Sequence, residues 1–292
     1  MLINGIWLVI WGYLVAIRFC FERLKKRPRN FLRATGVSLE EFSSLVTKCQ
    51  PKWLSKVLSP KQIDGRPYGV VDLENHILVL LLYYRCYITQ EFIGMLYGTA
   101  DSSICRTIQR IEPILASVMA IKKNRTLSKK ELDTIIMDCT EQPIERPKRK
   151  QKKYYSGKKK RHTMKTQIQI SESGKIVSVS RSFPGSTHDF EVYKQGSPLA
   201  ANSTVYVDSG YQGLDKLHKA TVLPFKKPKK GSLSRDEKKH NTTLSKKRVA
   251  VENKIRELKV FRIVSDKYRN KGRGYGLKFN IVAGLVNMKK GF

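Results

Sequence analysis

Acidic residues are scarce in this sequence, which has 24 Asp and Glu against 57 Lys and Arg and a formal net charge of +33 over 292 residues. This imbalance argues against a small anionic metabolite as the sole partner and favours a polyanion. Hydrophobic residues make up 40% of the chain, which is enough for a folded core and excludes wholesale disorder. The length fits one large domain or two ordinary ones.

Cysteine is also scarce and shows no pairing pattern. The five cysteines are scattered, odd in number and without a C-x-x-C pair: Cys20, Cys49, Cys86, Cys105 and Cys139. This distribution argues against a zinc knuckle and against a disulfide framework, and it favours a reducing compartment.

No clear membrane or secretion signal is present. The uncharged segment Met1–Ile17 is shorter than the ~20 residues of a spanning helix, and neither a positive region before it nor a small-residue cleavage site after it supports a signal peptide. Its basic flank, Arg18–Arg29, would suit a short signal anchor. We interpret residues 1–29 as an extension, with a packed terminal helix and a membrane anchor as alternatives.

Residues 30–120 follow a helical period, and they are predicted to form a DNA-binding domain. Ser38 and Glu41 have the spacing of a capping box, and Leu73–Tyr84 is densely apolar, as a core helix would be. Two short helices are then predicted on either side of Gly98, a residue that permits the tight turn between them.

These two helices predict a helix-turn-helix. Thr89 would cap the first, whose inward residues would be Phe92, Ile93 and Leu96. The second would start at Asp101 or Ser102 and bury Ile104, Ile108 and Ile111. Its DNA-facing side chains would be Ser102, Ser103, Arg106 and Arg110. An ordinary helical hairpin is the alternative.

After a predicted linker at residues 121–131, the period changes from helical to alternating. Five strands are predicted at Thr134–Asp138, Thr163–Ile170, Lys175–Arg181, Thr204–Asp208 and Thr221–Phe225, followed by a helix over Leu244–Val260. The predicted fold class is therefore α+β: an all-α helix-turn-helix domain, then an α/β domain over residues 132–292 with a mixed five-stranded sheet of ribonuclease-H-like order.

Three acids have the positions of a metal site. Asp138 and Asp208 end two predicted strands, and Glu252 lies on the later helix. Hard divalent cations take oxygen ligands, and two metals about 3.5–4 Å apart need a bridging carboxylate. For each acid alone, an exposed loop carboxylate or a helix cap is the alternative.

The helix around Glu252 has a charged stripe and an apolar face. The stripe is Arg248, Glu252, Arg256 and Lys259, and it lies about 100° around the helix from Val251, Ile255 and Leu258. One face could therefore be buried while the other faces a charged site. Plain i, i+4 salt bridges on a solvated face are the alternative.

Several ordered segments together resemble the DDE transposases of bacterial insertion sequences, in the Tnp4-type branch of the insertion-sequence-five family, which is akin to Harbinger-type elements. The segments are Asp138–Ile144, Tyr155–Lys165, Gly185–Asp189, Asp208–Gly213 and the pattern Arg248-x3-Glu252-x6-Lys259. They extend over the chain from about Asn30 onward and leave the first residues uncovered.

The resemblance implies an enzyme that cuts and joins DNA strands, with Asp138, Asp208 and Glu252 as catalytic ligands of two Mg2+ ions, for which Mn2+ would substitute. Arg248 and Lys259 would hold the phosphate. Asp189, and with it Glu141, would be a supporting acid or an alternative ligand. The sequence has no G-x-S-x-G elbow, so the pair His188–Asp189 does not indicate a hydrolase.

Double-stranded DNA, as element ends and as target, is the implied partner, and a bacterial cytoplasmic, nucleoid-associated enzyme is expected. Joining two ends requires two active sites, so a homodimer or higher oligomer on paired ends is expected, which sedimentation with and without end DNA would test. A catalytically inactive copy that acts only as a helix-turn-helix DNA-binding protein is the alternative.

Basic runs indicate where DNA would lie. Arg146–Arg161, Lys226–Arg248 and Lys254–Lys290 each contain ten or more Lys and Arg. The first run contributes the predicted DNA contacts Lys158, Lys159, Lys160 and Arg161. Binding through such runs weakens steeply as salt rises.

Overall fold

A computed structural model describes residues 19–59, 68–119, 121, 127–196, 199, 202–270 and 274–292. The chain divides into two compact units: the residues up to Met119 with Val260–Ile263, and Ala120–Lys259 with Val264–Phe292. Of the predicted extension at residues 1–29, residues 1–18 lie outside the described residues. Within the described ranges, no helix is long and apolar enough to cross a membrane.

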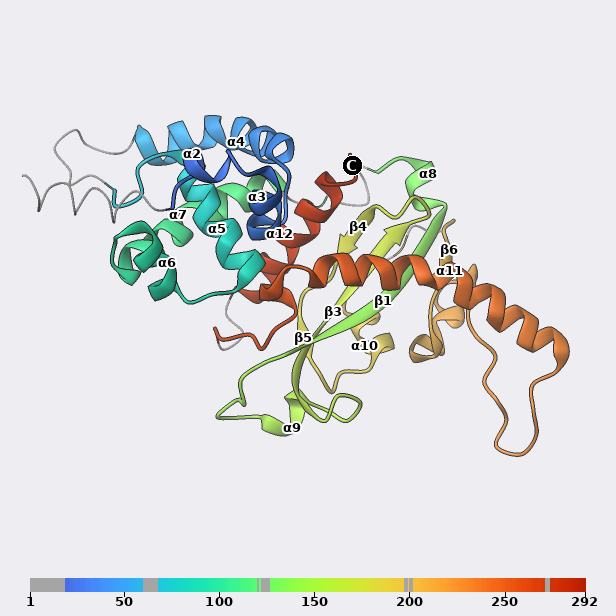
Figure 1. Ribbon diagram of the computed structural model, residues 1–292. Helices are drawn as coiled ribbons and strands as arrows, with labels where there is room; N and C mark the ends of the chain where they lie inside the picture. The colour runs from blue at the N-terminus through green and yellow to red at the C-terminus, as the bar shows by residue number, and fades with distance from the viewer. Residues whose placement is uncertain are drawn as a thin grey trace, which may run out of the picture. The chain divides into compact units, whose positions relative to one another are not determined.

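The first unit is helical (Figure 1). Its elements are α2 (Phe21–Leu24), α3 (Pro28–Thr35), α4 (Leu39–Trp53), the short π-helix η1 (Leu54–Leu58), α5 (Leu73–Cys86), α6 (Gln90–Tyr97) and α7 (Asp101–Met119). The predicted capping box begins α4, with Ser38 Oγ accepting from the Glu41 N–H at 3.1 Å and Glu41 accepting from the Ser38 N–H at 2.7 Å. Every residue from Ile77 to Tyr84 in α5 is buried, so this helix forms the core against α3, α4 and α7.

Helices α6 and α7 form the predicted pair. Thr89 Oγ1 accepts a backbone hydrogen bond at 3.1 Å from the first turn of α6, and Gly98 ends that helix at a φ of 62°, which favours glycine. The second helix is longer than predicted: it continues past Ile111, through Pro113, to Met119. The apolar face also continues over these added turns, because buried residues recur to the end of α7.

One inward side chain of α6 was predicted wrongly. Phe92 is 49% exposed, whereas its neighbour Ile93 is fully buried. A Cβ on Gly94 would lie 2.5 Å from the Thr99 carbonyl oxygen, so the chain approaches this helix closely at Gly94. The inward face is therefore centred on Ile93 and Gly94, about 100° around the helix from Phe92.

The second unit is built on a seven-stranded sheet. Its strands are β1 (Thr134–Pro143), β2 (Tyr155–Ser156), β3 (Arg161–Ser171), β4 (Ile176–Val179), β5 (Phe183–Pro184), β6 (Thr204–Tyr206) and β7 (Thr221–Val222). The order is β2-β3-β1-β6-β7, with β4 and β5 also pairing with β3. Antiparallel β1–β3 and parallel β1–β6 and β6–β7 pairs make the sheet mixed, which together with the helical first unit confirms the predicted α+β class.

Strand ends differ from the prediction in a way that matters for the site. The predicted first strand ended at Asp138, but β1 continues to Pro143 because its pairing with β3 continues to that residue. In contrast, β6 ends at Tyr206 and β7 at Val222, earlier than predicted. The edge of β1 next to β6 therefore loses its pairing with β6 after Ile136.

The helices of the second unit are α8 (Lys129–Leu132), α9 (Gln151–Tyr154), α10 (Asp189–Lys194), α11 (Arg235–Lys259) and α12 (Tyr275–Met288), with 3-10 turns η3 (Ser209–Tyr211), η4 (Leu214–Lys216) and η5 (Arg262–Val264). Helix α8 overlaps the end of the predicted linker at residues 121–131 and extends one residue beyond it. Helix α11 begins at Arg235, nine residues before the predicted start, because Ser234 and Glu237 form reciprocal backbone caps there.

The two faces of the sheet are covered by different helices. Ile135 and Met137 of β1 point into a core that includes Val205, Val207 and side chains from α10. Helix α11 crosses the sheet in contact with β1 and β6 (Figure 1). Because side chains alternate along a strand, the even-numbered residues of β1 point to the other face, where Asp138 meets α11.

Candidate active site

Strand register brings two of the predicted acids together. In the parallel pair β1–β6, Ile136 lies opposite Tyr206, the last matched position. Asp138 and Asp208 each follow two residues later, so the register places them side by side just beyond the end of β6. Both aspartates line one cavity of about 550 Å3.

Asp208 is held by the turn after β6. Its Oδ1 accepts a hydrogen bond from the Gly210 N–H at 2.8 Å and thereby caps η3. Gly210 has no room for a side chain, since a Cβ would lie 2.6 Å from Asp189 Oδ2 and 3.0 Å from Asp208 Oδ1. Glycine at this position therefore allows two carboxylates to approach each other.

Helix α11 supplies the remaining charged groups of the predicted stripe. Arg248 Nη2 lies 3.7 Å from Asp138 Oδ2, and its buried Nε has no hydrogen-bond partner among the described residues. Glu252, one turn further along, is exposed and lines the same cavity. Val251 and Leu258 are buried, as predicted for the apolar face. All three predicted catalytic acids thus border one space.

The environment of Asp138 leaves its charge incompletely compensated. Burial raises the pKa of Asp138 from 3.8 to about 6, although the Arg248 guanidinium opposes the rise. The negative charge of Asp208 adds to it, and so does that of Asp189. A buried carboxylate with a raised pKa would gain stability from a cation placed beside it.

Glu141 lies on the opposite face of β1 from Asp138, and there one lysine is shared between two carboxylates. Glu141 and Lys165 are cross-strand partners in the β1–β3 ladder, with Nζ and Oε1 3.7 Å apart. The same Nζ lies 2.7 Å from Asp189 Oδ1 and donates to the Thr187 carbonyl oxygen at 2.7 Å. Lys165 is only 7% exposed. The Lys165 network, defined as Lys165 with Glu141 and Asp189, therefore engages both acids expected to be supporting groups.

The sequence analysis missed Lys165, although it lies in a strand that was predicted. Burial lowers the pKa of Lys165, but the hydrogen bond from its ammonium to Asp189, with the charges of Asp189 and Glu141, raises it above the usual value overall. The lysine therefore stays charged. The available signal was its alternation within Thr163–Ile170, where a cation in a buried strand needs an acidic partner.

Of the predicted phosphate and DNA contacts of this unit, Arg248 and Lys158 line the cavity. Lys159, Lys160 and Arg161 follow in the exposed turn that begins β3. Partial burial, followed by the positive charge of Lys159, lowers the pKa of Lys259, while Asp138 and Glu141 counteract this change. These couplings indicate that the end of α11 is electrostatically linked to the site.

No set of three or more His, Cys, Asp or Glu side chains in the described ranges is arranged so that it could hold a metal ion. The chemistry of the donors nevertheless fits a hard divalent cation. Asp138, Asp208 and Glu252 all present carboxylate oxygens at one cavity, and Asp138 lacks a fully compensating charge.

In the first unit, the four predicted DNA-facing residues of α7 divide into two kinds. Ser102 and Arg106 are exposed, and Ser103 is half-buried. The Arg106 guanidinium donates to Ser102 on the helix surface, at 3.1 Å to its carbonyl oxygen and to its Oγ. Arg110 instead lies 3.9 Å from the centre of the Tyr68 ring.

A histidine fixes Arg110 further. Arg110 Nη1 is 3.2 Å from His76 Nε2, and His76 Nδ1 is 2.8 Å from the Asp72 carbonyl oxygen. Burial lowers the pKa of His76 to about 4, although the contact with the Asp72 carbonyl raises it. The neutral tautomer that donates from Nδ1 and accepts at Nε2 satisfies both contacts. Arg110 is therefore held by its own unit.

Comparison with known families matches most of the chain to two models. Residues 137–287 match the family described as DDE superfamily endonuclease. Residues 70–121, which contain α5, α6 and α7, match the family described as helix-turn-helix of DDE superfamily endonuclease.

Two curated proteins are similar over nearly their whole length. The "Probable transposase for insertion sequence element IS702" of Microchaete diplosiphon is 38% identical over 267 residues, which cover 89% of this chain and 94% of that protein. The "Putative transposase for insertion sequence element IS112" of Streptomyces albus G is 25% identical over 256 residues, which cover 80% and 93%. No solved structure matches the chain.

Proposed function

The chain belongs to the DDE superfamily of endonucleases and is a transposase of the insertion-sequence type, and we propose that it binds the terminal inverted repeats of its own element and cuts and joins DNA strands there with divalent metal ions. The observation that carries this proposal is the shared cavity of Asp138, Asp208 and Glu252. Strand β1 positions Asp138, helix α11 positions Glu252, and the capped turn directly after β6 holds Asp208.

We assign the metal-binding role to these three acids rather than to Asp189 or Glu141. Asp189 has Lys165 as a counter-charge at 2.7 Å, and Glu141 shares that lysine. Among the described residues, the one ion-pair contact of Asp138 is with Arg248, at 3.7 Å. When bound, Mg2+ or Mn2+ ions, two per site, would supply activation of the attacking oxygen and stabilisation of the leaving oxygen.

The cations around the cavity would bind and orient the DNA. Among the described residues, Arg248 makes one ion-pair contact, at 3.7 Å to Asp138, and its Nε has no hydrogen-bond partner, so its guanidinium retains donors for a phosphate. Lys158 lines the same cavity, and Lys159, Lys160, Arg161 and Lys259 extend the positive charge from it. These side chains would position the scissile phosphate before the acids act on it.

The proposal is tested by cleavage of DNA that carries the element's ends. Asp138→Ala, Asp208→Ala and Glu252→Ala should each reduce Mg2+-dependent cleavage by about a thousandfold or more, because each removes one metal ligand. DNA affinity should stay within about twofold, because Lys and Arg provide the DNA contacts. Rates come from gel analysis of labelled ends, and affinities from mobility shifts.

Glu257→Ala is the matched control, since Glu257 lies on the same helix but is paired with Lys254 at 2.9 Å. Its cleavage rate should equal that of the wild type. Cleavage at the wild-type rate in the Glu252 variant would contradict the assignment. A wild-type protein that binds ends but never cuts them would support the alternative of an inactive copy that acts as a DNA-binding protein.

We further propose that Arg106, rather than Arg110, reads bases from α7. Arg106 is exposed, whereas Arg110 is held by Tyr68 and His76. Arg106→Ala should weaken binding to the element's ends by about 1–3 kcal/mol and change binding to random duplex much less. Lys48→Ala, an exposed change on α4, should leave the ratio of the two affinities unchanged. Equal losses on both DNAs would mean that Arg106 contacts phosphate only.

A further inference from the structure

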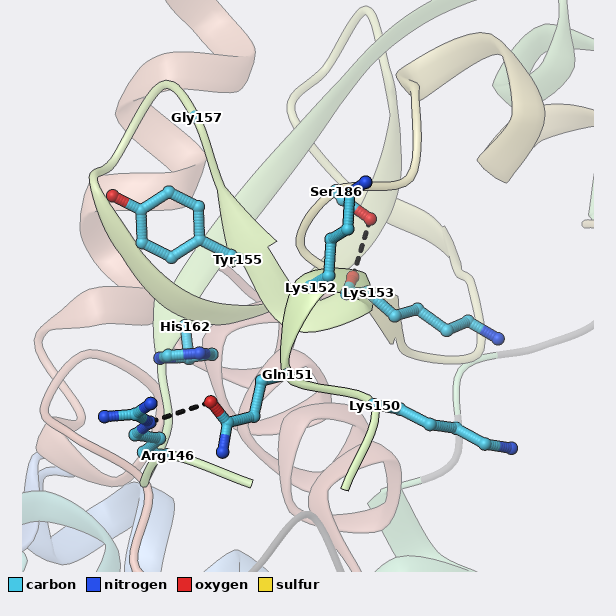
Figure 2. A pocket seen from close by; sticks show the side chains of 9 residues that line it. All are labelled: Arg146, Lys150, Gln151, Lys152, Lys153, Tyr155, Gly157, His162 and Ser186. Atoms are coloured by element: carbon cyan, nitrogen blue, oxygen red, sulfur yellow. Dashed lines mark hydrogen bonds between the residues drawn. The ribbon is translucent and has the colours of Figure 1, made fainter. Parts of the chain in front are cut away.

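A second cavity lies beside the carboxylates and is not used by the proposed chemistry. This hairpin pocket, of about 1090 Å3, is lined chiefly by Arg146, Lys150, Lys152, Lys153, Tyr155 and His162, in the segment between β1 and β3 (Figure 2). It shares three lining residues, Tyr155, Gly157 and Ser186, with the cavity of the catalytic acids. A ligand chain could therefore extend from one cavity into the other.

Flat side chains gather on one side of the pocket. The Tyr155 ring is 43% exposed and meets the His162 ring edge-on, with centroids 5.7 Å apart at 75°. Figure 2 shows both rings on the same side as Arg146, whose Nε donates to Gln151 Oε1 at 2.9 Å. An exposed, edge-supported ring with a planar guanidinium near it suits a ligand that has a flat aromatic face.

The opposite side of the pocket carries unpaired positive charge. None of the ammonium groups of Lys150, Lys152 and Lys153 has an ion-pair partner among the described residues. Lys150 has a φ of 56°, and Lys160, at the far end of the same hairpin, has a φ of 53°. Glycine or asparagine adopts this left-handed region more easily, so lysine is kept at both positions at a conformational cost. Three ammonium groups at one side of a pocket suit an anion such as a phosphate.

A flat aromatic face and a phosphate occur together in a nucleotide. The face of the base can stack on a protein side chain only when the base is not paired and stacked within a duplex. We propose that the hairpin pocket binds unpaired nucleotides of the DNA strand that runs from the catalytic acids, with a base stacked on Tyr155 and phosphates on the three lysines. The inference rests on the proposed function for its substrate. The pocket thereby distinguishes an opened or cut DNA end from intact duplex.

The test compares two DNAs with the full-length protein. One is a labelled blunt duplex of about 20 base pairs, and the other is the same duplex with a three-nucleotide overhang, 5′ or 3′. Affinities are measured by fluorescence anisotropy in EDTA, so that no cleavage occurs. Wild-type protein should prefer one overhang by about tenfold, because stacking of a base on an aromatic side chain strengthens binding by about this amount.

Tyr155→Ala should lower that preference at least fivefold and leave blunt-duplex affinity within twofold, while Tyr155→Phe should retain it. Tyr154→Ala is the matched control, because Tyr154 precedes Tyr155 in the same basic segment but does not line the pocket. 2-Aminopurine in the overhang should be quenched by wild-type protein and not by the Tyr155→Ala variant. Equal affinity of wild-type protein for both DNAs, or an unchanged preference in Tyr155→Ala, would overturn the proposal.

The result separates this inference from the proposed function. Protein that cuts end DNA with Mg2+ but shows no overhang preference would overturn the pocket alone. Protein that prefers the overhang through Tyr155 but cuts no DNA would support the pocket and contradict the catalytic assignment. Thermal melting of each variant checks folding, and the exposure of Tyr155 makes unfolding of the alanine variant unexpected.

Discussion

Strand β1 carries two acidic residues on opposite faces, Asp138 and Glu141, and their surroundings differ. On one face, Glu141 and Asp189 share the buried Lys165, at 3.7 Å and 2.7 Å. On the other, Asp138 lies beside Asp208, and its one ion-pair contact among the described residues is with Arg248, at 3.7 Å. Acids that are paired inside the protein hold it together, whereas acids left uncompensated are poised for an external cation. Proximity to the cavity alone does not distinguish the two groups, since both line it.

The largest effect on stability is expected when the Lys165 counter-charge is removed. Lys165→Met should lower the free energy of unfolding by about 3–5 kcal/mol, because it leaves two largely buried acids without their counter-charge. Lys158→Met is the control, since Lys158 lines the same cavity but is exposed, and its effect should stay within about 0.5 kcal/mol. Urea unfolding measures both. A loss below about 1 kcal/mol for Lys165→Met would place the Lys165 network among ordinary surface ion pairs.

Removal of the charge at Asp138 should have the opposite sign and a smaller size. The pKa of Asp138 is raised from 3.8 to about 6, mainly by burial, so the folded protein holds this proton over a pH range in which the unfolded chain releases it. Stability of the metal-free protein therefore falls as pH rises from about 4 to 6, and the full penalty remains above that range.

Asp138→Asn should accordingly stabilise the metal-free protein by about 2 kcal/mol at pH 8 and by little at pH 4. The matched change Asp189→Asn should destabilise it at pH 8, because Lys165 loses its 2.7 Å partner. Thermal melting in EDTA at the two pH values compares the variants. If the two substitutions change stability at pH 8 in opposite directions, the contrast between the two acidic groups is supported. Changes in the same direction would contradict it.

Much of this site could be predicted from the sequence. Two apolar strands that each lead to an aspartate, and a helix with a charged stripe opposite an apolar face, were enough to select Asp138, Asp208 and Glu252, which border one cavity. Their roles as metal ligands stay predictions. The sequence could not show that β1 continues past Asp138, because the pairing of β1 with β3 extends the strand through polar residues.

The Lys165 network could not be predicted from the sequence for a related reason. Glu141 and Lys165 become partners only through the antiparallel register of β1 and β3, which a single sequence does not specify. The prediction that Phe92 points inward was wrong for the same reason. The chain approaches α6 closely at Gly94, and the buried face of the helix is therefore the one that contains Ile93. The Ser38 capping box was predicted correctly, because it depends on residues close together in the sequence and needs no tertiary partner.

The most direct test of the account is whether the free protein binds a divalent cation through the uncompensated acids. Mn2+ binding can be followed by the electron paramagnetic resonance signal of the free ion, without DNA and without any cleavage readout. Wild-type protein should bind Mn2+ and melt at a higher temperature in its presence. Glu252→Gln should weaken this binding about tenfold or more, whereas Glu257→Gln on the same helix should not change it. Mn2+ binding of equal strength in wild type and Glu252→Gln would contradict the assignment of Asp138, Asp208 and Glu252 as the metal site.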